Sequence, residues 1–226
     1  MFFLLQTPAD SLSKAEAIGN QSLFDVLVSG GWTMIPIGIL FILAIFIYIE
    51  RYLTIKKADT DSGELMKQVR KYVLAGNIEA AKGLAQSTND AFSRMIYKGI
   101  SRLGTASLKD IEGSIENVGK LEVYRLERRL SLLATVAGAA PMLGFFGTVT
   151  GMIEAFNAIV IHEGNATPVD LAGGIAEAMV TTAAGLVVGI IAFLAYNTLV
   201  SMVSKVVFKL ELTSTDFIDL LQEPAS

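Results

Sequence analysis

Three long runs without a charged residue constrain this chain more than any other feature. The runs 32–49, 130–153 and 178–204 contain no Asp, Glu, Lys or Arg, the last two over 24 and 27 residues. A helix needs about 20 residues to cross about 30 Å of hydrocarbon. The alternative, buried helices of a soluble bundle, fits poorly with uncharged runs of this length. We therefore predict an all-α integral membrane protein with three transmembrane helices and long helices extending into the cytoplasm.

Lysine and arginine fall almost wholly on one side of a three-span chain. The segment 51–129 carries 15 of the 18 basic residues, and Lys205 and Lys209 follow the third run. The connection 154–177 carries none, and Lys14 is the one basic residue before the first run. Because basic residues near span ends stay in the cytoplasm, we expect an external N-terminus and a cytoplasmic C-terminus.

The runs and the charge pattern divide the chain into segments of different character. We expect an external tail at 1–31, with an interfacial amphipathic helix over 22–28, and a short external loop at 161–168. The three spans are then 32–55, 130–160 and 169–204. The cytoplasmic helical segment is 56–129, and the cytoplasmic C-terminal tail is 205–226.

Apolar stripes at helical spacing mark short helices in the cytoplasmic segment. Gly76 is placed to end the first helix, and Asn77 to begin a second that runs to about Ser87. Ser107 begins a further helix, which we expect to continue unbroken through Leu130 into the second span. The stripes are formed by Leu65, Met66, Val69, Tyr72 and Val73, by Phe92, Met95, Ile96, Gly99, Ile100 and Leu103, and by Ile111, Ile115, Val118 and Leu121.

Composition argues against several kinds of site. The chain has no cysteine and one histidine, His162, so disulfides, thiolate-bound metals and a protein-built zinc or haem site are not expected. The net charge of −4 does not favour nucleic-acid binding. No nucleophile, base and orienting group gather on one helix face. We predict no cofactor and no enzymatic activity.

Small residues recur in the second and third runs. Gly147 and Gly151 form a GxxxG pair, as do Gly185 and Gly189, and Gly144 and Pro141 precede the first pair. In lipid, helices associate through close backbone approach at small residues, so these positions are expected to pack spans together. Many unrelated bundles use the same pattern.

Two threonines and one glutamate are the polar features of these spans. Thr148 and Thr182 both lie about 18 to 20 Å from the outer end, so their hydroxyls can line a shared polar path. The alternative is that each hydroxyl bonds its own i−4 carbonyl. Glu177 lies about 12 Å into the apolar zone, where a carboxylate indicates an ion pathway or a buried partner, unless it reaches back to the interface. Thr181 shares the helix face of Glu177, whereas Thr182 is rotated about 140° from it.

Two stretches of the chain resemble a known family. Ala140-Pro-Met-Leu-Gly-Phe-Phe-Gly-Thr-Val-Thr-Gly-Met-Ile-Glu-Ala-Phe156 is similar to the second-span signature of the MotA/TolQ/ExbB proton-channel family. Gly174-Ile-Ala-Glu-Ala-Met-Val-Thr-Thr-Ala-Ala-Gly-Leu186 resembles its third-span signature, and residues 24–51 resemble its first span. By motif position, Thr148, Glu177 and Thr182 correspond to the pore-lining residues of the family.

The resemblance implies an assembly and a location. Family members form homopentamers in the bacterial inner membrane around a dimer of a single-span ExbD or TolR-type protein, whose membrane aspartate carries protons. The resemblance is closest to ExbB, which implies a proton channel that energises outer-membrane transport through a TonB-type protein. The alternative within the family is a TolQ-like subunit, which acts in envelope constriction. A membrane scaffold without an ion path is a further alternative.

Overall fold

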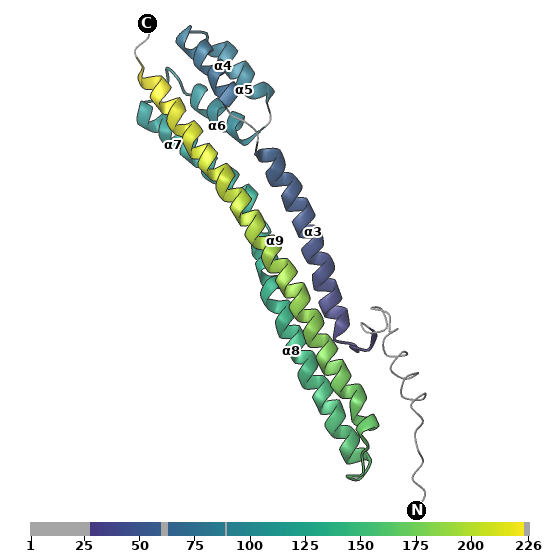
Figure 1. Cartoon of the computed structure of the whole chain (residues 1–226). Coiled ribbons are helices and arrows are strands. Elements are labelled where there is room, and N and C mark those ends of the chain that lie inside the picture. Colours follow the sequence, from purple (N-terminus) through teal and green to yellow (C-terminus); the bar gives the residue numbers. More distant parts are fainter. Residues whose placement is uncertain (1–27, 60–62, 89, 224–226) are drawn as a thin grey trace, which may run out of the picture. The chain divides into compact units, whose positions relative to one another are not determined.

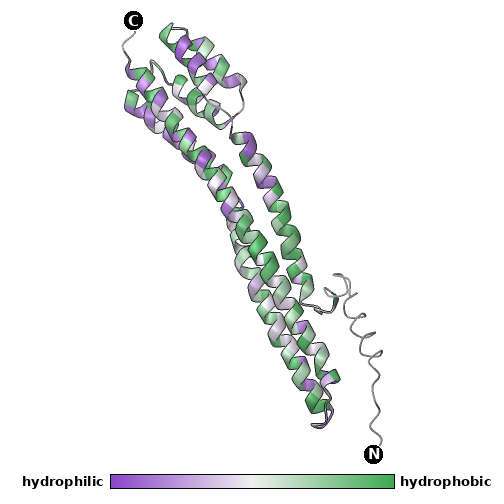
Figure 2. Ribbon diagram, viewed as in Figure 1, coloured by the Kyte–Doolittle hydropathy of each residue, from purple (hydrophilic) through white to green (hydrophobic). Residues whose placement is uncertain are grey.

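The structure, a computed structural model, describes residues 28–59, 63–88 and 90–223, and in this part of the chain it contains helices and no strand (Figure 1). Three stretches are helical, long and apolar enough to cross a membrane. They contain α3 (Met34–Ala58), α8 (Leu130–Ile161) and α9 (Pro168–Gln222). Figure 2 shows hydrophobic residues concentrated along these helices. The predicted all-α, three-span fold is confirmed, while the helix expected over 22–28 lies, apart from Val28, outside the described residues.

The chain divides into two compact units. The first unit consists of Met1–Leu43 and Thr135–Ala192, and the second of Ala44–Ala134 and Phe193–Ser226. Helices α3, α8 and α9 each contribute residues to both units. The first unit therefore holds the candidate ion pathway, and the second holds the short helices.

Four further helices belong to the second unit: α4 (Gly63–Leu74), α5 (Ile78–Ser87), α6 (Ala91–Ile100) and α7 (Leu108–Glu127). Gly76 follows α4 with a left-handed φ of 72°, and the Asn77 amide donates to the Tyr72 carbonyl, which caps the helix end. The Asn77 side chain accepts from the Ala80 amide, and Ser107 accepts from the Asp110 amide. These predicted helix ends are confirmed.

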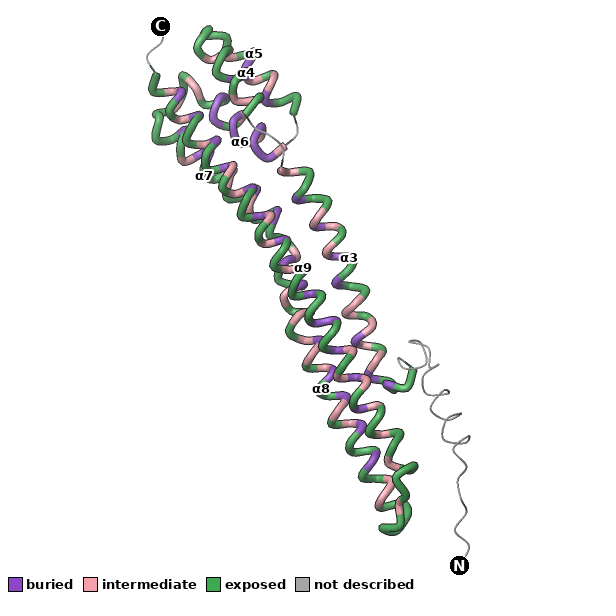
Figure 3. Tube along the Cα trace, viewed as in Figure 1, coloured by how far each residue is buried: buried purple, intermediate pink, exposed green. Residues whose placement is uncertain are grey.

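The core of the second unit lies on α6 and the facing side of α7. Phe92 and Ile96 on α6 and Ile115 on α7 are at most 1% exposed, in agreement with the predicted stripes. Figure 3 shows α6 as the most buried of the short helices. Leu103 is half-buried, and Leu121 is 49% exposed, so these two end residues of their stripes lie outside the core.

The expected continuous helix from Ser107 into the second span is wrong. α7 ends at Glu127, Arg128 is extended, and Arg129 is left-handed with a φ of 68° before α8 begins at Leu130. No glycine or proline lies between Gly119 and Gly138, so the sequence carries no local signal for this break. The Arg129 guanidinium forms an ion pair with Glu50 of α3, a tertiary contact that local periodicity does not report.

In the segment 205–226, expected to be a cytoplasmic C-terminal tail, α9 continues as helix to Gln222. Its Leu210 and Phe217 are at most 3% exposed, so one face is held in the core of the second unit. Lys205 and Lys209 bind Asp59, which follows α3, at 2.8 and 2.5 Å. The hydrogen bonds from these two ammonium groups hold the pKa of Asp59 below its usual range.

Candidate functional site

Glycines bring α8 and α9 into backbone contact in the first unit. A Cβ atom at Gly151 would lie 2.5 Å from the Gly174 carbonyl oxygen, and one at Gly174 would lie 2.5 Å from the Gly151 carbonyl oxygen. At Gly185 a Cβ atom would lie 2.6 Å from the Ala140 carbonyl oxygen. Because real Cβ atoms do not approach carbonyl oxygens this closely, only glycine fits these positions at the observed helix separation.

The remaining small residues of the two signatures lie in the same contact. Gly144 faces the Gly185 backbone, Gly189 faces the Pro141 ring, and Gly147 faces the Thr181 side chain. Gly138, by contrast, has nothing near its Cβ position. The small-residue pattern therefore packs the second span on the third within one chain.

The Thr148 and Thr182 side chains meet across this helix pair. Their hydroxyls are hydrogen-bonded to each other. Each hydroxyl also lies between its own i−4 carbonyl and a carbonyl of the opposite helix: Thr148 between Gly144 at 3.4 Å and Ala178 at 3.3 Å, and Thr182 between Ala178 and Gly144, both at 3.1 Å. Each hydroxyl has one proton. The pair and the two carbonyls thus form a short polar chain at the edge of an apolar contact, where both threonines are half-exposed.

Thr181 lies elsewhere. Its side chain is 0% exposed, and its hydroxyl donates to the Glu177 and Ala178 carbonyls at 2.9 and 3.0 Å. The side chain fills the space opposite Gly147. The structure thus encloses Thr181 in the helix contact and does not present it on an open face.

Glu177 is half-buried in the first unit. Its carboxylate lies against Gly31, which has a left-handed φ of 65°, so closely that any side chain at Gly31 would collide with it. The described residues of this unit include no lysine or arginine. Glu177 therefore has no basic side chain as a partner in the described part of its own unit.

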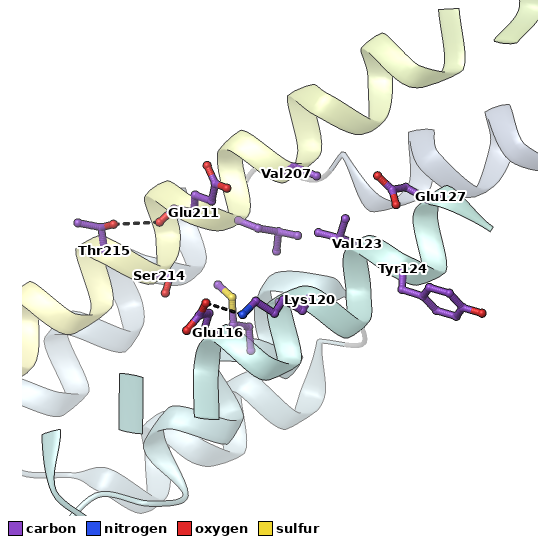
Figure 4. A pocket seen from close by; sticks show the side chains of 12 residues that line it. Glu116, Lys120, Val123, Tyr124, Glu127, Val207, Glu211, Ser214 and Thr215 are labelled. Carbon is purple, nitrogen blue, oxygen red and sulfur yellow. Dashed lines mark hydrogen bonds and ion pairs between the residues drawn. The ribbon is translucent and has the colours of Figure 1, made fainter. Parts of the chain in front are cut away.

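A groove in the second unit runs between α7 and α9 (Figure 4). Its lining includes the apolar residues Val123 and Leu210 and the acidic residues Glu127 and Glu211. The remaining lining residues are Met95, Glu116, Gly119, Lys120, Tyr124, Val207, Ser214 and Thr215. The groove combines apolar surface with the three carboxylates of Glu116, Glu127 and Glu211.

No cluster of His, Cys, Asp and Glu suited to a metal ion occurs among the described residues. Sequence reasoning named the chemistry-bearing residues of the spans. It did not anticipate Gly31 beneath Glu177, or the role of Gly174 opposite Gly151. A glycine facing a glycine across two antiparallel helices is the signal that could have identified the second position.

Comparisons with known proteins agree on one family. Residues 87–212 match the sequence profile of the MotA/TolQ/ExbB proton channel family. A Synechocystis sp. protein named ExbB-like 1 is 31% identical over 205 residues, which cover 90% of this chain and 75% of the relative. The biopolymer transport protein exbB1 of Vibrio cholerae is 30% identical over 150 residues, 64% of this chain and 66% of the relative. The Tol-Pal system protein TolQ of Haemophilus influenzae is 47% identical over 78 residues, only 34% of each chain.

Proposed function

We propose a function for this chain from one premise: it belongs to the MotA/TolQ/ExbB proton channel family. The relatives and the three apolar helices support a membrane protein with a role in biopolymer transport. We propose that it is the channel subunit of a bacterial inner-membrane motor. In this role it uses the proton motive force, with a single-span ExbD-type partner, to energise TonB-dependent outer-membrane transport.

The hydrogen-bonded pair of Thr148 and Thr182 is the observation that carries this proposal. Two polar groups from different spans meet at one edge of a contact that is built mainly from glycine and alanine, with Thr181 and Pro141. Glu177 lies one turn and a half from Thr182 toward the start of α9. We propose that the three side chains line the ion path and that Thr181 serves helix packing.

The sequence of the spans supports a partner that supplies the proton carrier. The runs 32–49, 130–153 and 178–204 contain no Asp or Glu. A proton crossing the membrane gains about 2.3 kcal/mol for each 100 mV, but it needs an ionisable group near the middle to use that drive. We propose that a membrane aspartate of a single-span partner dimer fills this role inside a homopentamer of this chain.

Exposed apolar residues outside the spans support self-association. Leu121 and Tyr124 on α7 are 49% and 70% exposed, and Phe208 and Leu212 on α9 are 61% and 49% exposed. In the proposed orientation, with 51–129 in the cytoplasm, these side chains are in contact with water, and Tyr124 lines the α7–α9 groove. Such a surface marks an interaction site, and neighbouring copies of the chain are its proposed cover.

A second function within the family has its own support. The relative with the name TolQ shares 47% identity, although over only 78 residues. A TolQ-type subunit would use the same ion path to drive envelope constriction. In a scaffold without conduction, the hydrogen bond between Thr148 and Thr182 would only hold the two helices together.

Gene deletion and rescue in the native bacterium would test the proposal. An ExbB-type subunit predicts loss of ferric-siderophore uptake with normal resistance to detergents, and rescue by the wild-type gene. A TolQ-type subunit predicts chained, detergent-sensitive cells with normal uptake. Normal uptake and a normal envelope in the deletion strain would count against both motor roles, and co-purification would identify the single-span partner.

A further inference from the structure

Four arginines gather in the second unit where α3 and α8 meet the short helices. Arg51 lies near the end of α3, and Arg125, Arg128 and Arg129 surround the break between α7 and α8. We propose that this arginine cluster binds the phosphate headgroup of an anionic phospholipid. The proposed orientation places this lipid in the cytoplasmic leaflet. Binding of the lipid does not depend on ion conduction.

Glu50 joins the two ends of the arginine cluster. Its Oε1 accepts from Arg51 Nη2 at 2.7 Å, and its Oε2 is ion-paired with Arg129 Nη1. Arg51 Nη1 also donates to the Arg125 carbonyl at 3.3 Å. One carboxylate thereby holds two guanidinium groups from different helices side by side.

The cluster carries more positive charge than its acidic neighbours balance. Glu50 serves both Arg51 and Arg129, and Arg128 is exposed without a hydrogen bond or ion pair to any described residue. Glu122 is the partner of Arg125, but Arg94 shares it. Glu127 lines the α7–α9 groove instead. Arg51 and Arg129 therefore share one carboxylate, and Arg128 has none among the described residues.

Donors as well as charge are in excess. Arg129 uses Nη1 for Glu50, and no described residue accepts from its Nε or Nη2. Arg51 Nε is buried without a partner in the described structure. Planar guanidinium groups match phosphate oxygens in pairs. The left-handed backbone of Arg129, which is uncommon for a long side chain, is the kind of local strain that surrounds binding sites.

Apolar surface beside the cluster favours a lipid over a free phosphate ion. Ile49 and Leu53 on α3 are 53% and 61% exposed, and Leu132 on α8 is 48% exposed. Ile49 and Leu132 lie on the side of the arginines toward the apolar runs of their helices, and Leu53 lies two residues beyond Arg51. Basic residues that adjoin the cytoplasmic ends of spans attract anionic lipids. A headgroup on the arginines with acyl chains along these side chains satisfies both surfaces.

Lipid retention tests this inference without a partner or a proton gradient. The full chain is transferred from nanodiscs of phosphatidylcholine and phosphatidylglycerol to native mass spectrometry, and the retained lipid is identified. The wild-type protein is expected to retain phosphatidylglycerol in preference to phosphatidylcholine. Arg128→Gln should weaken retention about fivefold, and Arg128→Gln with Arg129→Gln more strongly. Lys98→Gln with Arg102→Gln removes the same charge as the double variant from two exposed residues that have no ion pair with the arginine cluster, and should have no effect.

Each outcome of these experiments supports or overturns the proposed lipid site. Equal retention in wild type and Arg128→Gln, or an equal loss in the Lys98 and Arg102 control, would overturn the site. Titration with inorganic phosphate in detergent separates the two phosphate sources. If phosphate binding depends on Arg128 and the protein shows no preference for phosphatidylglycerol over phosphatidylcholine, the ligand is free phosphate and the proposal of a lipid ligand is overturned. Because Arg128 has no partner within the described residues, its single variant remains informative even where the double variant fails to fold.

Discussion

The Thr148 hydroxyl on α8 and the Thr182 hydroxyl on α9 are hydrogen-bonded to each other. They are 34 residues apart in the sequence, and the antiparallel course of the two helices brings them to the same depth. Each also lies within reach of its own i−4 carbonyl, so the two arrangements considered from the sequence coexist. A hydroxyl that exchanges between two acceptors is suited to pass a proton or to order water.

Replacing one hydroxyl of this pair should lower ion-driven transport while the fold is kept. Thr148→Val and Thr182→Val preserve side-chain volume but remove a hydrogen bond of about 1 kcal/mol. If the pair lines the path, a barrier change of this size reduces proton flux by about fivefold or more. Flux would be measured in proteoliposomes that contain the chain and its co-purified partner.

Thr150→Val is the matched control for that experiment. Thr150 lies on the same helix, and its hydroxyl donates only to the α8 carbonyls of Phe146 and Gly147. The Thr150→Val variant should conduct protons as the wild type does, and Thr148→Ser should retain most of the proton flux. Equal flux in Thr148→Val, Thr182→Val and Thr150→Val would remove the threonine pair from the path.

Adding one methyl group at Gly151 should separate α8 from α9. The new Cβ atom would lie 2.5 Å from the Gly174 carbonyl oxygen and 2.9 Å from the Ala178 amide nitrogen, both on rigid backbone. Overpacking of this kind costs about 1 to 3 kcal/mol, so the midpoint of thermal unfolding in detergent should fall.

Gly138→Ala places the same methyl group where no atom lies within 4 Å. Alanine favours helix over glycine by about 1 kcal/mol, so this variant should be as stable as wild type or slightly more stable. A similar loss of stability in both variants would show that the close α8–α9 approach at Gly151 is not its cause, because helix propensity favours alanine at both positions.

Much of the fold could be predicted because its signals are local. Uncharged runs identified the spans, and Gly76, Asn77 and Ser107 marked helix ends through their own backbone and side-chain chemistry. The polar pair in the spans could be predicted from depth alone, since a regular helix converts residue number into distance.

The parts that could not be predicted depend on tertiary contacts. Arg129 leaves the helix where Glu50 of α3 binds it, and nothing near it in sequence reports that partner. The face of Thr181 was equally undetermined, because a helix wheel does not say which side the neighbouring helix occupies. The continuation of α9 did leave a signal: Val206, Leu210, Thr213, Phe217 and Leu220 recur at helical spacing and are all buried.

Glu177→Gln should reduce transport with little effect on folding. The amide keeps the size of the carboxyl group against Gly31 but cannot ionise. If Glu177 belongs to the ion path, siderophore-dependent growth should slow markedly while the amount of protein in the membrane stays normal. Glu163→Gln, an exposed residue of the loop between α8 and α9, is the control and should grow normally. Normal growth of Glu177→Gln would assign the carboxylate to the interface.

Acid should weaken the link between α3 and α9 through Asp59. Lys205 and Lys209 hold its pKa below the value of about 3.9 that an unfolded chain has. The contribution to stability is therefore complete above about pH 4 and is lost as the pH falls through the lowered pKa of the folded state. The midpoint of thermal unfolding in detergent, measured from neutral pH downward, should fall in that acidic range.

Asp59→Asn isolates this effect from the titration of other carboxyl groups. The amide cannot form the charged pair, so the variant should be less stable than wild type at neutral pH, and the difference between the two proteins should shrink below about pH 4. Asp219→Asn removes an acidic residue near the end of the same helix that has no ion pair among the described residues, and its difference from wild type should stay small across the whole range. A constant gap between Asp59→Asn and wild type at every pH would mean that Asp59 stabilises the fold through its shape and hydrogen bonds and not through its charge.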